Sequence, residues 1–167
     1  MLKLIGSLFI LFSALQFGMA KSRTLTLRVR CLEQLEGLLV QFLGEVGFGL
    51  RPLPQIFERL GNQSGGEGFA LAAREMNLRD GRSANSCFCT AIQSAYPLLT
   101  QEEKTVLLSL GEGLGTCDHN TQCRLIESVI RELAVKRKLA EEFAAKNGKL
   151  YRGLGITGGL FLILLLI

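Results

Sequence analysis

The chain has 167 residues, with 19 Lys and Arg against 15 Asp and Glu, one His and five Cys. This length suits a single domain, and a hydrophobic content of 48% is too high for a disordered tail or an ordinary soluble enzyme domain. The net charge of +4 is too small to predict nucleic-acid binding. The excess of apolar residues lies at the two ends of the chain, so the composition favours a membrane-held domain over a catalyst.

The first apolar segment is residues 1–20, in which the run from Leu4 to Ala20 carries no charge. As a helix this run is about 25 Å long, near the lower limit for crossing a bilayer. The alternative is a cleavable signal peptide ending at Gly18-Met-Ala20. A signal peptide needs its positive charges before the apolar run, whereas here they mostly follow it, at Lys21, Arg23, Arg28 and Arg30. We therefore expect residues 1–20 to form an N-terminal transmembrane helix.

The second apolar segment is residues 153–167, which Leu150 and Tyr151 extend. We expect it to form a C-terminal transmembrane helix. Gly155 and Gly159 form a GxxxG pair, a spacing that lets another helix approach closely. Small residues are also common in such helices without a packing role, so both interpretations of the pair stay open.

The charges that flank the two apolar segments predict the topology of the chain. Residues 21–30 carry only positive charges, residues 136–152 carry a positive excess, and only Lys3 lies beyond the flanks. Basic flanks mark the cytoplasmic side, so we expect residues 21–152 to form a cytoplasmic domain. An odd number of cysteines agrees with free thiols in a reducing compartment. A secreted or membrane-tethered domain with paired cysteines and a cleaved signal peptide is the alternative.

The region between the apolar ends predicts helices, because no stretch shows the period-two alternation of a half-buried strand. Apolar spacing, prolines and capping residues place six helices with short connections, which predicts an all-α helical bundle. The expected helices run over about 24–48, from Pro52 to Leu60, over 69–78, from a Ser83 cap to before Pro97, from a capping box at Thr100, and from an Asp118 cap to about 146. The first of them is expected to continue from the N-terminal span.

Few residues could carry chemistry. Cys117, His119 and Cys123 lie close together in the sequence, but a zinc site needs four ligands held tetrahedrally, and a Cys nucleophile needs a base within reach. The glycine-rich run from Gly111 to Gly115 follows no strand, unlike a phosphate-binding loop. We therefore predict no enzyme, no metal, no cofactor, no small-molecule substrate and no nucleic-acid partner.

Residues 31–135 carry a net charge of about −5 between the two basic flanks. An acidic domain close to a membrane could dock a basic partner. A merely solvated surface would have the same composition, so this alternative also stays open.

Three motifs carry a resemblance to a known family. They are Pro52-Leu-Pro-Gln-Ile-Phe-Glu-Arg-Leu60, the block from Leu110 to Asp118 with Gln122, and the ending from Lys149 to Gly159. In this order the chain resembles the stage III sporulation protein AB family of endospore-forming bacteria over essentially its whole length. Cys117 stands where the family pattern usually has Ser, a small and similarly weakly polar residue.

The resemblance implies a helical bundle similar to the cytoplasmic domains of the type II secretion platform protein F. It implies a non-enzymatic component of the channel that joins mother cell and forespore, in the mother-cell membrane around the forespore, needed for endospore development. The expected partners are the membrane and other stage III sporulation channel proteins. The analogy with protein F also suggests a contact with the cytoplasmic ATPase, stage III sporulation protein AA.

The block from Leu114 to Gln122 also has a physical interpretation. Gly115 suits the left-handed residue that ends one helix, and Asp118 suits the cap that starts the next. Our hypothesis is that this turn also presents a loop to a partner. The interaction candidates are Leu114, Gly115, Asp118, Gln122, Gly155 and Gly159.

Overall fold

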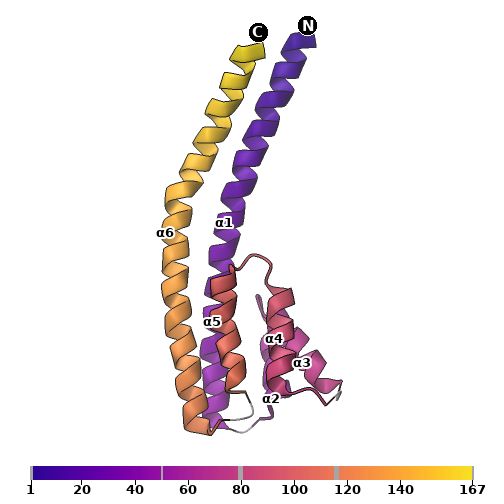
Figure 1. The fold of residues 1–167 in the computed structure, drawn as a ribbon, viewed down its shortest axis with the longest axis vertical. Coiled ribbons are helices and arrows are strands. Elements are labelled where there is room, and N and C mark those ends of the chain that lie inside the picture. Colours follow the sequence, from indigo (N-terminus) through magenta and orange to yellow (C-terminus); the bar gives the residue numbers. More distant parts are fainter. Residues whose placement is uncertain (1, 50, 79–80, 115–116, 167) are drawn as a thin grey trace. The chain divides into compact units, whose positions relative to one another are not determined.

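The computed structural model describes residues 2–49, 51–78, 81–114 and 117–166, without most side chains of 2–18 and 151–166. Within the described residues the structure is all-helical, as predicted, and contains six helices (Figure 1). These are α1 (Leu2–Phe48), α2 (Leu53–Gly61), α3 (Glu67–Asn77), α4 (Ala84–Ala95), α5 (Gln101–Glu112) and α6 (His119–Leu166).

The chain divides into two compact units. The first, which we call the bundle unit, is residues 30–137. The second, the terminal-helix unit, joins residues 1–29 to residues 138–167. Helices α1 and α6 each contribute to both units, whereas α2 to α5 belong to the bundle unit alone.

The starts of α2, α4 and α5 are the ones that the sequence predicts, whereas α3 begins at Glu67, two residues before the predicted Phe69. Pro52 precedes α2, where its missing N–H costs no hydrogen bond. The Ser83 hydroxyl accepts a hydrogen bond from the Ser86 amide at the start of α4. Thr100 and Glu103 form the expected capping box of α5, with the Glu103 carboxylate 2.8 Å from the Thr100 amide nitrogen. Local capping chemistry therefore fixes where these helices begin.

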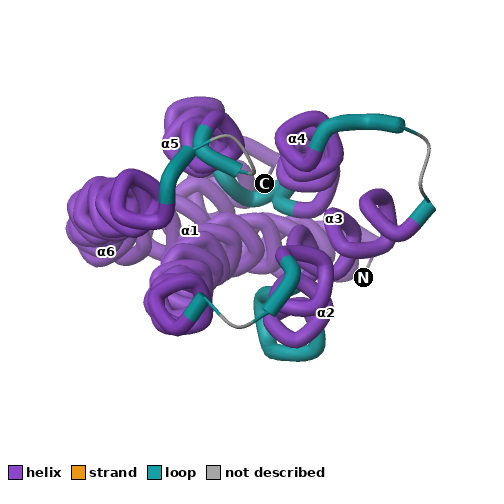
Figure 2. The backbone as a smooth tube through the Cα atoms, turned by 90° about the horizontal axis from the view of Figure 1, so that it is seen from below, coloured by secondary structure: helices purple, strands orange, loops and turns teal. Residues whose placement is uncertain are grey.

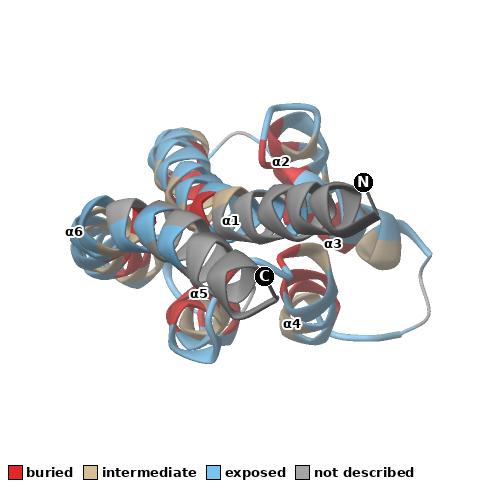
Figure 3. Ribbon diagram, turned by 90° about the horizontal axis from the view of Figure 1, so that it is seen from above, coloured by how far each residue is buried: buried red, intermediate tan, exposed pale blue. Residues whose placement is uncertain are grey.

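The core of the bundle unit lies between α1 and the helices α2 to α6, which follow one another in chain order from one side of α1 to the other (Figures 2 and 3). Apolar residues that recur at every seventh position of α1 supply one side of this core, and three of them, Leu32, Leu39 and Val46, are buried. Four fully buried rings form the centre, with neighbouring centroids 5.4–6.4 Å apart in tilted or edge-on arrangements: Phe42, Phe57, Phe69 and Phe88.

In the terminal-helix unit, the start of α1 and the last turn of α6 lie at the same end of the unit (Figure 1). Ser22 of α1 and Ala140 of α6 are buried there, and a Cβ on Gly148 would lie 3.2 Å from the Ser22 hydroxyl oxygen. The glycine thus lets the two helices approach closely at this point.

Helix α6 differs in two ways from the sequence expectation. It continues to Leu166 instead of ending near Lys146, because Gly148 falls on a packed face and does not interrupt the helix. The apolar spacing of the last helix puts Phe143 on one side with Ile126, Val129 and Leu133 and so predicts its burial, yet Phe143 is half-exposed. On a 3.6-residue helix Phe143 lies at the edge of that stripe, about 40° from Val129, and it follows the end of the bundle unit at Arg137.

Within the part of the chain that the structure describes, no helix has a stretch both long and apolar enough to cross a membrane. Most side chains of the expected spans, residues 1–20 and 153–167, lie outside the described part. The two transmembrane helices therefore stay predictions from the sequence.

Candidate interaction site

The turn between α5 and α6 places the predicted interaction residues in different environments. Leu114 is buried in the bundle core, whereas Asp118 is exposed and Gln122 is half-buried. Gly115 lies outside the described residues. The structure thus brings Asp118 to the surface together with its neighbours, since residues 117–121 are all exposed.

Asp118 caps α6, as predicted. Its carboxylate accepts a hydrogen bond of 3.2 Å from the Thr121 amide, and its carbonyl accepts one from the Gln122 amide. The hydrogen bonds from Thr121 hold the pKa of the Asp118 carboxyl below its ordinary value. The carboxylate is therefore ionised at neutral pH and stands next to solvent, where a partner could reach it.

Two glycines before this turn have a packing role that the sequence analysis missed. A Cβ on Gly111 would lie 2.5 Å from the Asn85 side-chain oxygen of α4, and a Cβ on Gly113 would lie 2.5 Å from Leu125 of α6. These glycines let α5 and the turn pack closely on α4 and α6. The repeated glycines in the sequence could have indicated this close packing, but we considered them only as a possible phosphate-binding loop.

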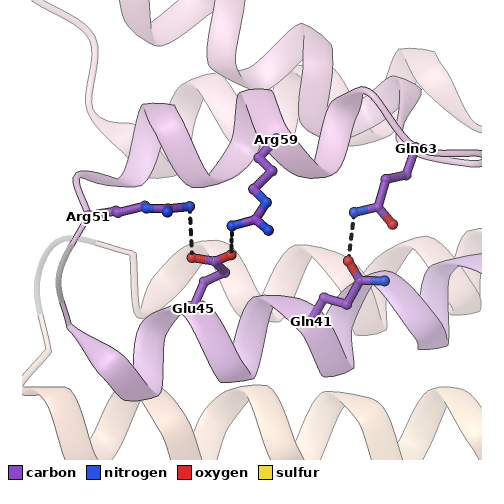
Figure 4. Close-up of polar contacts among 5 residues, drawn as sticks. All are labelled: Gln41, Glu45, Arg51, Arg59 and Gln63. Carbon is purple, nitrogen blue, oxygen red and sulfur yellow. Dashed lines mark hydrogen bonds and ion pairs between the residues drawn. The ribbon is translucent and has the colours of Figure 1, made fainter.

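A second candidate surface lies between the end of α1 and α2 and was not predicted. Glu45 accepts hydrogen bonds from two guanidinium groups, Arg59 at 2.6 Å and Arg51 at 3.5 Å (Figure 4). One turn earlier, the Gln63 amide donates to Gln41 at 2.6 Å. Two positive charges share one carboxylate, so this cluster keeps one unbalanced positive charge.

Beside this cluster the surface has an open groove of about 450 Å³. The ring of Phe48, at the end of α1, lines it and is 81% exposed. An exposed aromatic ring next to two arginines can contact an apolar side chain and an acidic group of a protein partner at once. The groove is lined by Gln41, Gly44, Glu45, Phe48, Arg51 and Arg59.

The polar groups inside the bundle have structural roles. The Tyr96 hydroxyl donates to the Gly65 carbonyl at 2.8 Å and accepts from the Gly68 amide at 3.1 Å. Burial, together with the nearby carboxylates of Glu67 and Glu103, raises the pKa of Cys31 to about 11. A thiol in this state is a poor nucleophile at neutral pH.

The other predicted residues do not form a chemical site. Gly155 and Gly159 lie within α6, at positions where the structure describes no surroundings. Among the described residues, no group of three or more His, Cys, Asp or Glu side chains could hold a metal ion. What the described surface offers is an exposed capped turn and an open groove with paired arginines, both suited to contact with another protein.

These features define an all-helical domain whose first and last helices are long. The chain belongs to the stage III sporulation protein AB family, whose model matches residues 3–167. Stage III sporulation protein AB of Bacillus subtilis (strain 168) is 29% identical over 170 residues, covering 99% of both chains. A solved structure of stage III sporulation protein AB (SpoIIIAB) is similar with a TM-score of 0.62 and 22% identity, over 68% of this chain and 93% of that one. The structural likeness shows the helical fold, and the family match shows that this is a sporulation protein.

Proposed function

We propose that the protein is a non-enzymatic membrane platform in the channel between mother cell and forespore, and that it assembles there with other stage III sporulation proteins. Its terminal segments, residues 1–20 and 153–167, insert in the mother-cell membrane around the forespore. The bundle unit stands in the cytoplasm, where the ATPase stage III sporulation protein AA is a candidate partner.

The observation that carries this proposal is the continuity of the first and last helices. Helix α1 passes from the bundle unit to Leu2, and α6 passes from it to Leu166, each as one helix. Both enter apolar sequence after a basic stretch, which is the charge order of a membrane-spanning helix with its cytoplasmic side at the bundle.

The same continuity argues against a cleaved signal peptide. Cleavage after Ala20 would cut inside α1, two residues before Ser22, whose side chain is buried near Gly148. The part of α1 that would be lost is helical and continuous with a packed segment. We therefore favour retention of residues 1–20 over the secreted alternative.

The turn around Asp118 is the proposed partner-facing loop of the bundle unit. Its residues 117–121 are exposed, and the carboxylate of Asp118 is held in place by the Thr121 amide. Asp118→Asn keeps a capping side chain and removes the charge. We expect this variant to fold normally and to assemble less well with other channel proteins in a co-purification assay. Normal assembly of a stable chain with residues 117–121 fully altered would contradict the partner-facing role.

Gly155 and Gly159 are proposed to pack α6 against α1 of the same chain. Gly155 lies seven residues after Gly148, so the two share a face of α6, and Gly148 lies against Ser22 of α1. This gives the GxxxG pair a helix partner within the molecule.

Thiol labelling with a membrane-impermeant reagent tests the proposed topology. We would express two variants in vegetative cells, where the chain inserts in the plasma membrane: one with Cys117 as its single cysteine, and a matched one with a single cysteine at position 3. Both would be labelled in intact spheroplasts and again after permeabilisation. The proposal predicts labelling of Cys117 only after permeabilisation, and labelling of Lys3→Cys without it. Ready labelling of Cys117 from outside would reverse the topology and remove any contact with a cytoplasmic ATPase.

A further inference from the structure

A row of apolar side chains is exposed along the outer face of α6 in the terminal-helix unit. Leu139 is 56% exposed, Phe143 is 49% exposed and Leu150 is 54% exposed. Large apolar side chains on a solvent-facing helix are usually isolated, and a row of them marks a contact surface.

The spacing of this row is that of a coiled-coil seam. Starting from Leu139, alternate steps of four and three residues reach a series of positions in which every member is exposed. Such steps define the a and d positions of a heptad, which meet a partner helix along one line. The series is Leu139, Phe143, Lys146, Leu150, Gly153 and Thr157.

This seam faces away from the helix that α6 already contacts. Ala140 and Gly148 are the buried positions of α6 here, and Gly148 lies against Ser22 of α1. On a 3.6-residue helix these two positions fall well outside the arc that holds the seam. A Cβ on Gly153 would meet nothing within 4 Å, so the space in front of the seam is open. The seam is therefore available to a second helix.

We propose that the outer face of α6 pairs with α6 of a second copy of this chain, in parallel and in register. A heptad seam is self-complementary when two identical helices run parallel, because each a position then meets its own equivalent and each d position does the same. Two copies held in one membrane with the proposed topology present this seam in the same direction. The parallel sense of the pair rests on that proposed function, whereas the seam itself does not.

The one charged position of the seam favours alignment of the two copies. Lys146 lies between the apolar Phe143 and Leu150, and a polar residue at such a position fixes register at a cost in stability. In the aligned pair the two ammonium groups can extend to solvent, and Glu142 lies one turn before each of them. A shifted pair would instead bury Lys146 against Phe143 or Leu150.

Disulfide crosslinking of single cysteines tests the pair in membranes that contain the full chain. With the native cysteines replaced, we would compare Phe143→Cys and Leu150→Cys with Ala145→Cys, which is exposed on the same stretch of α6 but off the seam. We expect covalent dimers from the first two variants and none above background from the third. Equal yields from all three, or none from the two seam positions, would overturn the proposal.

A second comparison separates the pairing from chance collisions. Leu139→Glu places a charge in the seam, whereas Leu78→Glu places one on an apolar residue of the bundle unit with the same 56% exposure. We expect the first change to abolish the crosslink at position 150 and the second to leave it intact. A crosslink confined to only one of positions 143 and 150 would indicate an antiparallel pair and overturn the parallel arrangement. Because crosslinking does not depend on which side of the membrane the bundle occupies, its failure is distinguishable from a failed topology.

Discussion

The Arg137 guanidinium of α6 donates a hydrogen bond of 2.8 Å to the Glu36 carboxylate of α1, across a sequence separation of 101 residues. Both side chains are about three-quarters buried, and the pair joins the first and last helices of the bundle unit. A charged hydrogen bond at this depth contributes more to stability than an exposed ion pair does.

We therefore expect Arg137→Met to lower the free energy of unfolding by about 1–2 kcal/mol. Chemical denaturation of the full chain in detergent measures this change. A matched control is Arg131→Met, which removes an exposed pair with Glu127 at 3.7 Å, and should change stability by less than about 0.5 kcal/mol. Equal effects of the two substitutions would show that the long-range pair contributes no more to the free energy of unfolding than the exposed pair does.

Tyr96 closes the loop that leads into α3, because its hydroxyl bonds both Gly65 and Gly68. Tyr96→Phe leaves a buried carbonyl and a buried amide without their partner, and we expect a loss of about 2 kcal/mol in the free energy of unfolding. Ser94→Ala removes a hydroxyl that bonds only local helix carbonyls, so its effect should stay within about 0.5 kcal/mol. A neutral Tyr96→Phe substitution would argue that water replaces the lost hydroxyl.

The half-buried thiol of Cys31 predicts a stability change at alkaline pH. Its pKa in the folded chain is about 11, raised from 9.0 by burial and by Glu67 and Glu103. Between these two pH values the unfolded chain loses the thiol proton while the folded chain keeps it, so the free energy of unfolding falls as pH rises. Cys31→Ser should show a shallower fall from pH 9 to 11 in parallel denaturation curves. Identical slopes for the two proteins would contradict the raised pKa.

Two helix glycines are expected to respond in opposite ways to alanine. A Cβ on Gly61 would lie 2.6 Å from the Ala70 Cα, so Gly61→Ala must push α2 and α3 apart, at a cost of about 1–3 kcal/mol. Gly37 is exposed within α1 and has nothing within 4 Å of an added Cβ. Gly37→Ala should raise stability by about 0.5–1 kcal/mol, because alanine favours the helix. Thermal unfolding of both variants measures whether each change raises or lowers stability. Destabilisation by Gly37→Ala would show that the surroundings of Gly37 are not open.

The sequence was sufficient to predict those features of the fold that depend on residues close together in the chain. The caps at Ser83, Thr100 and Asp118, and the apolar series of α1, each depend on residues within a turn or two of one another. Such patterns predict the helix starts and the all-α class. The family followed from motifs spread over the same segments, and its model confirms it.

What the sequence could not supply are contacts between distant segments. No neighbouring residue in the sequence indicates that Glu36 pairs with Arg137. Likewise, none indicates that the Glu45 carboxylate accepts hydrogen bonds from both Arg51 and Arg59. The exposed side of α6 was missed for a related reason. Phe143 is apolar, and the sequence alone placed it in the core although it lies at the edge of the apolar stripe, beyond the end of the bundle unit.

The arrangement of the bundle unit has a consequence for how it folds. Helix α2 packs on α3, α3 on α4 and α4 on α5, so these contacts join segments that are neighbours in the chain and can form early. The contact of Glu36 with Arg137 requires the closure of a loop that contains all four of those helices. Loop closure of this length is entropically costly, so docking of α6 onto α1 is the expected late step of the folding reaction.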